Sequence, residues 1–92
     1  MYTLDIAVQA KKDIAYLKKN GEKAAVKKIE KLLLELIKHP TTGTGQVEQL
    51  KGNRQGEWSR KIDKKNRLVY SIDDEIVRVE VISAKGHYGD KW

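Results

Sequence analysis

The sequence predicts an α+β domain in which a strand comes first, a two-helix hairpin second, and a three- to four-stranded antiparallel sheet last. Two observations predict this order. Apolar residues recur every three or four positions over residues 9–38, which is typical of amphipathic helices. They alternate with polar residues in the part of the chain after Glu48, which is typical of strands. Because 92 residues suffice for one modest core, residues 1–92 should form a single domain.

The chain is expected to open with a strand and a helix. In residues 2–8, β-branched and aromatic side chains nearly alternate with other types, which predicts a short strand. Residues 9–19 place Ile14 and Leu17 at helical spacing among lysines, so a helix is predicted there. Gly21 follows, and glycine readily adopts the left-handed conformation that commonly ends a helix.

A second helix is expected over residues 22–38, antiparallel to the first. Its apolar side chains form one stripe. Pro40 ends this helix, because the residue before a proline is driven out of the helical region. The loop 41–46 ("TTGTGQ") that follows is unusual in its glycine and threonine content. The stripe consists of Val26, Ile29, Leu33, Leu36 and Ile37.

Three consecutive strands are expected in the second half of the chain. A period of two, with apolar side chains at alternate positions, occurs in residues 57–63, 67–73 and 75–83. Short polar turns separate them, at residues 64–66 and 73–74, as hairpins require. These strands should therefore form an antiparallel meander.

The two faces of this sheet have different expected roles. The helices should cover the face that carries Leu68, Tyr70 and Ile72. Arg67 should then point to the opposite face, into a basic concavity. Strict alternation places Arg60 on the covered face, so its direction is left open.

Charge and composition narrow the possible partners. Nineteen Lys and Arg against thirteen Asp and Glu give a net charge of +6, which attracts nucleic acid, an anionic membrane or an acidic protein. The chain has no cysteine, which excludes disulfides and cysteine-based zinc sites. It has neither a signal-type apolar region nor an apolar run long enough to span a membrane, so a cytoplasmic location is expected.

Several familiar chemistries find little support. His39 and His87 are the only histidines, so no metal site and no cofactor are expected. A serine hydrolase triad could be written with Ser59, Ser71 or Ser83, but the sequence has no nucleophile elbow and no glycine-rich oxyanion turn. The Gly-Thr-Gly at residues 43–45 is not a P-loop, because no Gly-Lys-Ser/Thr follows it.

The remaining polar groups suit a phosphodiester. The 2′-hydroxyl of RNA can attack the adjacent phosphorus, so an enzyme needs only a base, a cation for the developing charge and an acid for the leaving oxygen. No metal is required for this route. On composition alone, a plain RNA-binding domain is favoured over an enzyme. The groups concerned are Glu48, Lys51, Arg60, Lys61, Arg67, His87 and Tyr88.

Four motifs occur in a fixed order: "ExLKGN" from Glu48, "WSRKI" from Trp58, "NRLVY" from Asn66 and "HY" at residues 87–88. In these motifs the sequence resembles the YoeB/Txe branch of the RelE/ParE toxin superfamily, and the resemblance extends over essentially the whole chain. It implies a RelE-like fold and a toxin of a type II toxin–antitoxin system. Such a toxin is a ribosome-dependent endoribonuclease that cuts mRNA in the ribosomal A site and so inhibits translation. The implied partners are an acidic cognate antitoxin, the ribosome with its mRNA, and a second copy of the chain.

The resemblance also implies roles for individual residues. Glu48 would be the general base on the 2′-hydroxyl, and Arg67 the cation at the phosphate oxygens. His87 would be the general acid, and Tyr88 would position the base or phosphate by stacking or hydrogen bonding. The opposite assignment, with His87 as the base, stays open. The expected phosphate-binding residues, with individual roles unassigned, are Lys51, Arg60 and Lys61.

Two alternative functions stay open at this point. A ParE-like toxin would act on DNA gyrase without cutting RNA, and the set Glu48, Arg67 and His87 argues against it. A non-catalytic module would bind RNA through charge alone. Cleavage of mRNA on translating ribosomes would support only the endoribonuclease.

Overall fold

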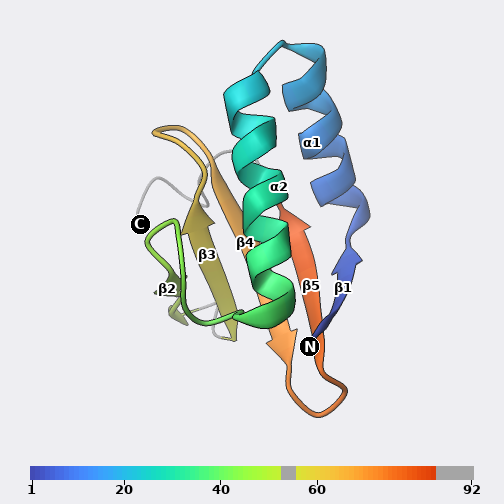
Figure 1. The fold of residues 1–92 in the computed structure, drawn as a ribbon, viewed down its shortest axis with the longest axis vertical. Coiled ribbons are helices and arrows are strands. Elements are labelled where there is room, and N and C mark those ends of the chain that lie inside the picture. The colour runs from blue at the N-terminus through green and yellow to red at the C-terminus, as the bar shows by residue number, and fades with distance from the viewer. Residues whose placement is uncertain (53–55, 85–92) are drawn as a thin grey trace.

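The computed structural model has two layers, with two helices packed on one face of a sheet (Figure 1). It describes residues 1–52 and 56–84. Within these residues the sheet has five strands, and the predicted α+β class is confirmed. The helices are α1 (Val8–Lys19) and α2 (Lys23–Lys38). The strands are β1 (Thr3–Ile6), β2 (Glu48–Gln49), β3 (Glu57–Lys61), β4 (Arg67–Asp73) and β5 (Arg78–Ser83).

The strand order across the sheet is β1-β5-β4-β3-β2. The pairs β2–β3, β3–β4 and β4–β5 are antiparallel, which confirms the predicted meander. The first strand joins this meander at its far edge, where β1 runs parallel to β5 with Thr3 opposite Arg78 and Ile6 opposite Val81. The helical hairpin between β1 and the meander lets the chain cross the sheet before β2 begins (Figure 1).

Both helices end where the sequence predicts. Gly21 has a φ of 72° and donates its N–H to the Lys18 carbonyl at 3.1 Å, so the glycine closes α1 in the left-handed conformation. The last residue to donate into α2 is His39, whose N–H binds the Glu35 carbonyl at 2.6 Å. Pro40 follows and cannot continue the helix.

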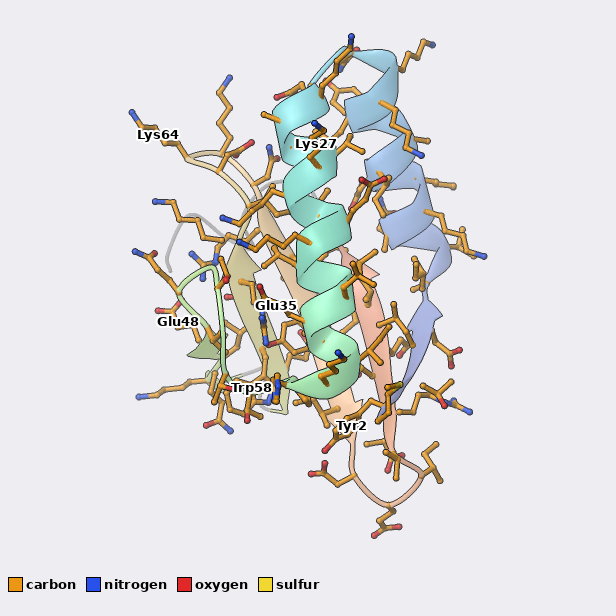
Figure 2. The ribbon with its side chains drawn as sticks, viewed as in Figure 1. Tyr2, Lys27, Glu35, Glu48, Trp58 and Lys64 are labelled. Atoms are coloured by element: carbon orange, nitrogen blue, oxygen red, sulfur yellow. The ribbon has the colours of Figure 1, made fainter. Side chains whose placement is uncertain are left out.

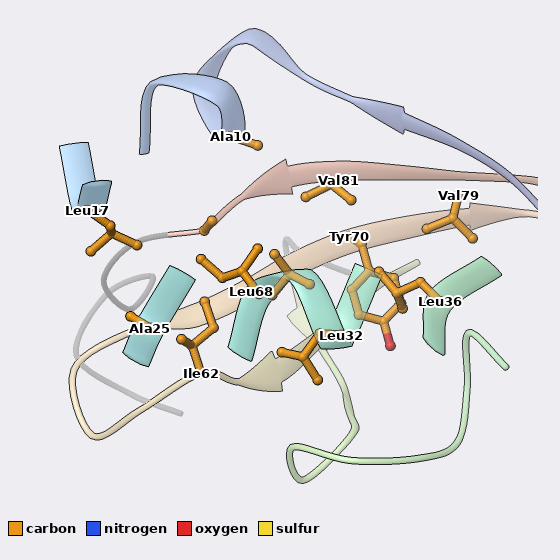
Figure 3. Close-up of a cluster of buried hydrophobic side chains, with 12 residues drawn as sticks. Ala10, Leu17, Ala25, Leu32, Leu36, Ile62, Leu68, Tyr70, Val79 and Val81 are labelled. Carbon is orange, nitrogen blue, oxygen red and sulfur yellow. The ribbon is translucent and has the colours of Figure 1, made fainter. Parts of the chain in front are cut away.

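The core lies between the two helices and the strands β4 and β5 (Figure 3). Tyr70 is fully buried in it, and its hydroxyl donates to the Pro40 carbonyl at 2.6 Å. Burial raises the pKa of this hydroxyl above its usual value. Among the described residues, no helix combines the length and apolar character needed to cross a bilayer. The buried apolar side chains include Leu17, Ile29, Leu32, Leu36, Leu68, Val79 and Val81.

Candidate active site

Glu48 of β2 and Arg67 of β4 meet on the face of the sheet opposite the helices. Glu48 lies directly opposite Ser59 in the β2–β3 pair, and residues directly opposite each other share a face. The Arg67 Nη2 atom lies 3.4 Å from the Glu48 Oε2 atom. The Glu48 side chain is 50% exposed and the Arg67 side chain only 7%. The pair therefore joins an accessible carboxylate to a cation that the protein holds in place.

Ser59 and Gln46 also hold the guanidinium of Arg67. Its Nε donates to the Ser59 hydroxyl at 3.0 Å, and its Nη2 donates to the Gln46 carbonyl at 3.2 Å. These acceptors fix the plane of the guanidinium, because an arginine presents its donors as a rigid fork. Ser59, considered in the sequence only as a hydrolase nucleophile, here supports the arginine. As alternation predicts, Arg67 faces away from the core side of β4.

An open pocket of about 400 Å³ lies beside this pair. It is lined by Gln46, Val47, Glu48 and Arg67. Gln46 has a φ of 50°, a conformation that is uncommon for residues other than glycine. Such outliers occur often at functional sites. The sequence motifs pointed to Glu48 and Arg67 of this site, but neither they nor the unusual loop 41–46 assigned a role to Gln46.

The other predicted site residues are distributed unequally. Lys61 lies directly opposite Arg67 in the β3–β4 pair and so shares its face. Lys51 is exposed after the end of β2. Arg60 is fully buried on the core side of β3, and its guanidinium binds groups of the protein itself. The structure thus brings Glu48, Lys61 and Arg67 to one face and separates Arg60 from them.

His87 and Tyr88 lie outside the described residues. Their catalytic roles, and the phosphate-binding roles of the lysines, stay predictions. Figure 2 shows Glu48 at the edge of the molecule formed by β2, on the far side from α1. Within residues 1–52 and 56–84, no group of three or more His, Cys, Asp or Glu side chains is placed to hold a metal ion. The chemistry offered by the described site is that of a base beside a cation.

With the fold and this pair of residues defined, the chain can be compared with known proteins. A family model described as "YoeB-like toxin of bacterial type II toxin-antitoxin system" matches residues 7–88. The chain belongs to this family. The match confirms the resemblance drawn from the four sequence motifs, and it makes the chain a toxin of the type II toxin–antitoxin class.

Individual relatives agree with this assignment. Toxin YoeB of Streptomyces coelicolor is 38% identical over 69 residues, which cover 74% of this chain and 79% of the relative. The structure of a YoeB/ParE toxin from Agrobacterium tumefaciens superimposes with a TM-score of 0.86 at 31% identity, covering 94% of this chain and 99% of that one.

Two structures of YoeB from Staphylococcus aureus are similar at 36% identity. One is a heterotetrameric complex with the antitoxin YefM, with a TM-score of 0.79 and coverage of 96% of this chain and 99% of that one. The other is a YoeB dimer, with a TM-score of 0.81 and coverage of 95% and 98%. The relatives thus share the whole fold described above.

Proposed function

We propose that this YoeB-like toxin is a ribosome-dependent endoribonuclease that cuts mRNA in the ribosomal A site and thereby inhibits translation. The observation that carries the proposal is the pair of Glu48 and Arg67, a half-exposed carboxylate 3.4 Å from an almost buried guanidinium. Both line the open pocket of about 400 Å³. A base next to a fixed cation supplies two of the three groups that cleavage of RNA through its own 2′-hydroxyl requires, the third being an acid.

The reaction begins at the 2′-hydroxyl of the nucleotide in the pocket. Glu48 removes the proton as the 2′-oxygen attacks the adjacent phosphorus. Arg67 stabilises the negative charge that develops on the non-bridging oxygens. The bond from phosphorus to the 5′-oxygen then breaks, leaving a 2′,3′-cyclic phosphate on one fragment and a 5′-hydroxyl on the other.

The leaving 5′-oxygen needs a proton, and His87 supplies it in this proposal. Tyr88 positions the nucleotide by stacking or hydrogen bonding. Lys61, on the same face as Arg67, and the exposed Lys51 bind flanking phosphates. These steps require no metal, because Glu48, Arg67 and His87 supply the base, the cation and the acid.

The partners follow from the charge and from the relatives. A net charge of +6 suits the anionic surface of the ribosome and its mRNA, and action on ribosomes implies a cytoplasmic location in this proposal. The same charge suits an acidic antitoxin. The complex of the Staphylococcus aureus relative with YefM supports an antitoxin as the partner. The dimer of that relative supports a homodimer as a further state. Copurification of an untagged acidic neighbour from the native operon tests the antitoxin.

The experiment that tests the activity is brief expression of the toxin followed by mapping of new mRNA 5′ ends against the reading frame. The wild type should produce ends at defined positions of translated codons. Glu48→Gln and His87→Ala should each lower the cleavage rate roughly a hundredfold to ten-thousandfold, the usual contribution of one positioned acid or base.

Glu75→Gln is the matched control, because Glu75 is exposed in the β4–β5 turn. It should cut at the wild-type rate. Growth inhibition by Glu48→Gln without new mRNA ends would contradict the proposal and leave a gyrase-directed toxin. Ribosome binding by the wild type without any cleavage would leave a non-catalytic RNA-binding module.

A further inference from the structure

Arg60 carries a fully buried guanidinium on the core side of β3. Its Nε lies 3.2 Å from the Tyr70 hydroxyl, to which it donates, and its Nη1 donates to the Glu35 carboxylate at 2.9 Å. Figure 2 shows Glu35 on the side of α2 toward β3. Burying a charge is costly unless it is paired and hydrogen-bonded. Arg60 is therefore fixed between a helix and the sheet.

The same guanidinium holds the 39–46 loop, which connects α2 to β2. Its Nη2 donates to the His39 carbonyl at 2.5 Å and to the Thr42 carbonyl at 2.7 Å. The Thr44 carbonyl lies 3.5 Å from Nη1. The Thr44 N–H in turn donates to the Glu35 carboxylate at 2.9 Å. The ion pair between buried Arg60 and partly buried Glu35 thus binds several backbone groups of a loop that has no helix or strand of its own.

Two glycines let this loop wind closely around the ion pair. A Cβ atom at Gly43 would lie 2.5 Å from the Glu35 Oε1 atom and 3.0 Å from the Arg60 Nη1 atom. At Gly45, a Cβ atom would lie 2.9 Å from the Lys61 carbonyl oxygen. Both glycines also have positive φ angles, of 122° and 95°. The path of the loop is therefore set by contact with Arg60 and β3.

The loop leads directly to the Glu48–Arg67 pair. The Gly45 carbonyl accepts a hydrogen bond from the Lys61 N–H at 2.5 Å, which ties the loop to the end of β3. The next residue, Gln46, places its carbonyl 3.2 Å from the Arg67 Nη2 atom. Glu48 begins β2 shortly afterwards. A guanidinium on each face of the sheet thus holds one end of the same loop.

We propose that Arg60 is a positioning residue of the active site, which acts through the 39–46 loop to set the place of Glu48 beside Arg67. This inference rests on the proposed endoribonuclease function. Arg60 itself touches no RNA, since its guanidinium is enclosed by protein acceptors. A displacement of about 1 Å at a catalytic group can cost about a hundredfold in rate. Loss of Arg60 should therefore slow cleavage without weakening binding.

Arg60→Met tests this, since methionine has a long unbranched side chain and no donor. In single-turnover cleavage of mRNA on programmed ribosomes, we expect a rate about a hundredfold lower and unchanged ribosome affinity. In a Glu48→Gln background, Arg60→Met should cause little further loss, because residues acting through one group are not additive. Gly45→Ala, which retains Arg60 but displaces the loop, should reproduce the slow rate.

If Arg60→Met does not fold, Arg60→Met combined with Glu35→Met removes both charges of this ion pair and serves in its place. A folded variant with the wild-type rate, beside an inactive Glu48→Gln, would overturn this inference alone. Weaker RNA binding by Arg60→Met, with the slope of log affinity against log salt concentration reduced by about 1, would make Arg60 a phosphate ligand. That result would also overturn the inference. Full activity of Glu48→Gln would instead overturn the proposed function.

Discussion

Asp13 of α1 accepts a hydrogen bond from the backbone N–H of Ala84, at 3.0 Å, although the two residues are 71 positions apart. The carboxylate also accepts from the Gln9 side-chain amide at 2.9 Å. Asp13 is buried, so water does not replace these partners. The first helix thereby fixes the backbone at Ala84, the residue directly after β5.

Removal of this carboxylate should destabilise the fold. Asp13→Ala leaves the buried N–H of Ala84 without its acceptor, and we expect the free energy of unfolding to fall by about 2 kcal/mol. Asp13→Asn keeps an oxygen that can accept, so its loss should be smaller. Urea unfolding of the two variants and the wild type measures both effects. Equal stability of Asp13→Ala and the wild type would show that the contact contributes nothing.

The planar guanidinium of Arg67 should matter more than its charge. Arg67→Lys keeps the charge but loses the fork that contacts Ser59, Gln46 and Glu48, so we expect a loss of cleavage of about a hundredfold. Ribosome binding, which depends on many lysines, should barely change. Arg78→Lys is the control, because Arg78 is a half-exposed arginine of β5 paired with Asp5. Equal cleavage by the two lysine variants would remove Arg67 from the mechanism.

The helices and the meander could be predicted because local patterns determine them. The apolar stripe of α2, the glycine at position 21 and the proline at position 40 act over a few residues, and the structure has helix ends within one residue of those predicted. The alternation in β4 placed Leu68 and Tyr70 in the core and Arg67 on the opposite face. In both the helix and the strand, the spacing of the apolar residues along the sequence directly indicates which face is buried.

The parallel pairing of β1 with β5 could not be predicted in the same way. A strand shows the same alternation whether its neighbour runs parallel or antiparallel. The spacing of Leu4 and Ile6 therefore does not indicate whether β1 runs parallel or antiparallel to β5. The burial of Arg60 is a similar case. Its acceptors are the carbonyls of His39 and Thr42, and any residue type supplies a carbonyl, so no motif identifies them.

The Glu48–Arg67 pair was proposed from the resemblance, and the geometry came only from the structure. The residues lie on non-adjacent strands of the sheet, separated by β3. Their approach depends on the register of two hairpins and on the turn at Gln46. A shift of one residue in the strand register would place either side chain on the other face of the sheet. The two residues of β2 are too few for an alternating pattern that would fix this register.

Glu35 should make stability depend on pH. The hydrogen bond from the Thr44 N–H, with a smaller contribution from the charge of Arg60, lowers the pKa of Glu35 below its ordinary value of 4.5. A lowered pKa means that the ionised form stabilises the fold. This contribution is complete above about pH 4.5 and is lost as the pH falls through the pKa of the folded state.

Comparison with Glu35→Gln isolates this contribution from that of Asp63. Burial acts to raise the pKa of Asp63, but hydrogen bonds from the Lys65 and Asn66 N–H groups outweigh it and lower the pKa overall. The contribution of ionised Asp63 to the free energy of unfolding is therefore lost in acid in both the wild type and Glu35→Gln. Urea unfolding from pH 7 to pH 3 should show that the wild type is more stable than Glu35→Gln near neutrality. The difference between their free energies of unfolding should shrink below about pH 4.5. A constant difference across this range would rule out the ionisation of Glu35 as its source.

Val77 should be a site where substitution stabilises the protein. It has a φ of 52° in the β4–β5 turn, a conformation that costs a β-branched residue about 1 kcal/mol and that asparagine tolerates. Val77 is 42% exposed, and the Val77 carbonyl, which accepts from the Thr3 N–H at 2.8 Å, persists in any variant. We therefore expect Val77→Asn to raise the melting temperature by about 5 °C. The neighbouring Ile76→Asn, with an ordinary φ and similar exposure, should give no such increase. An equal response of the two variants would show that the gain comes from added polarity and that backbone strain at Val77 is not its cause.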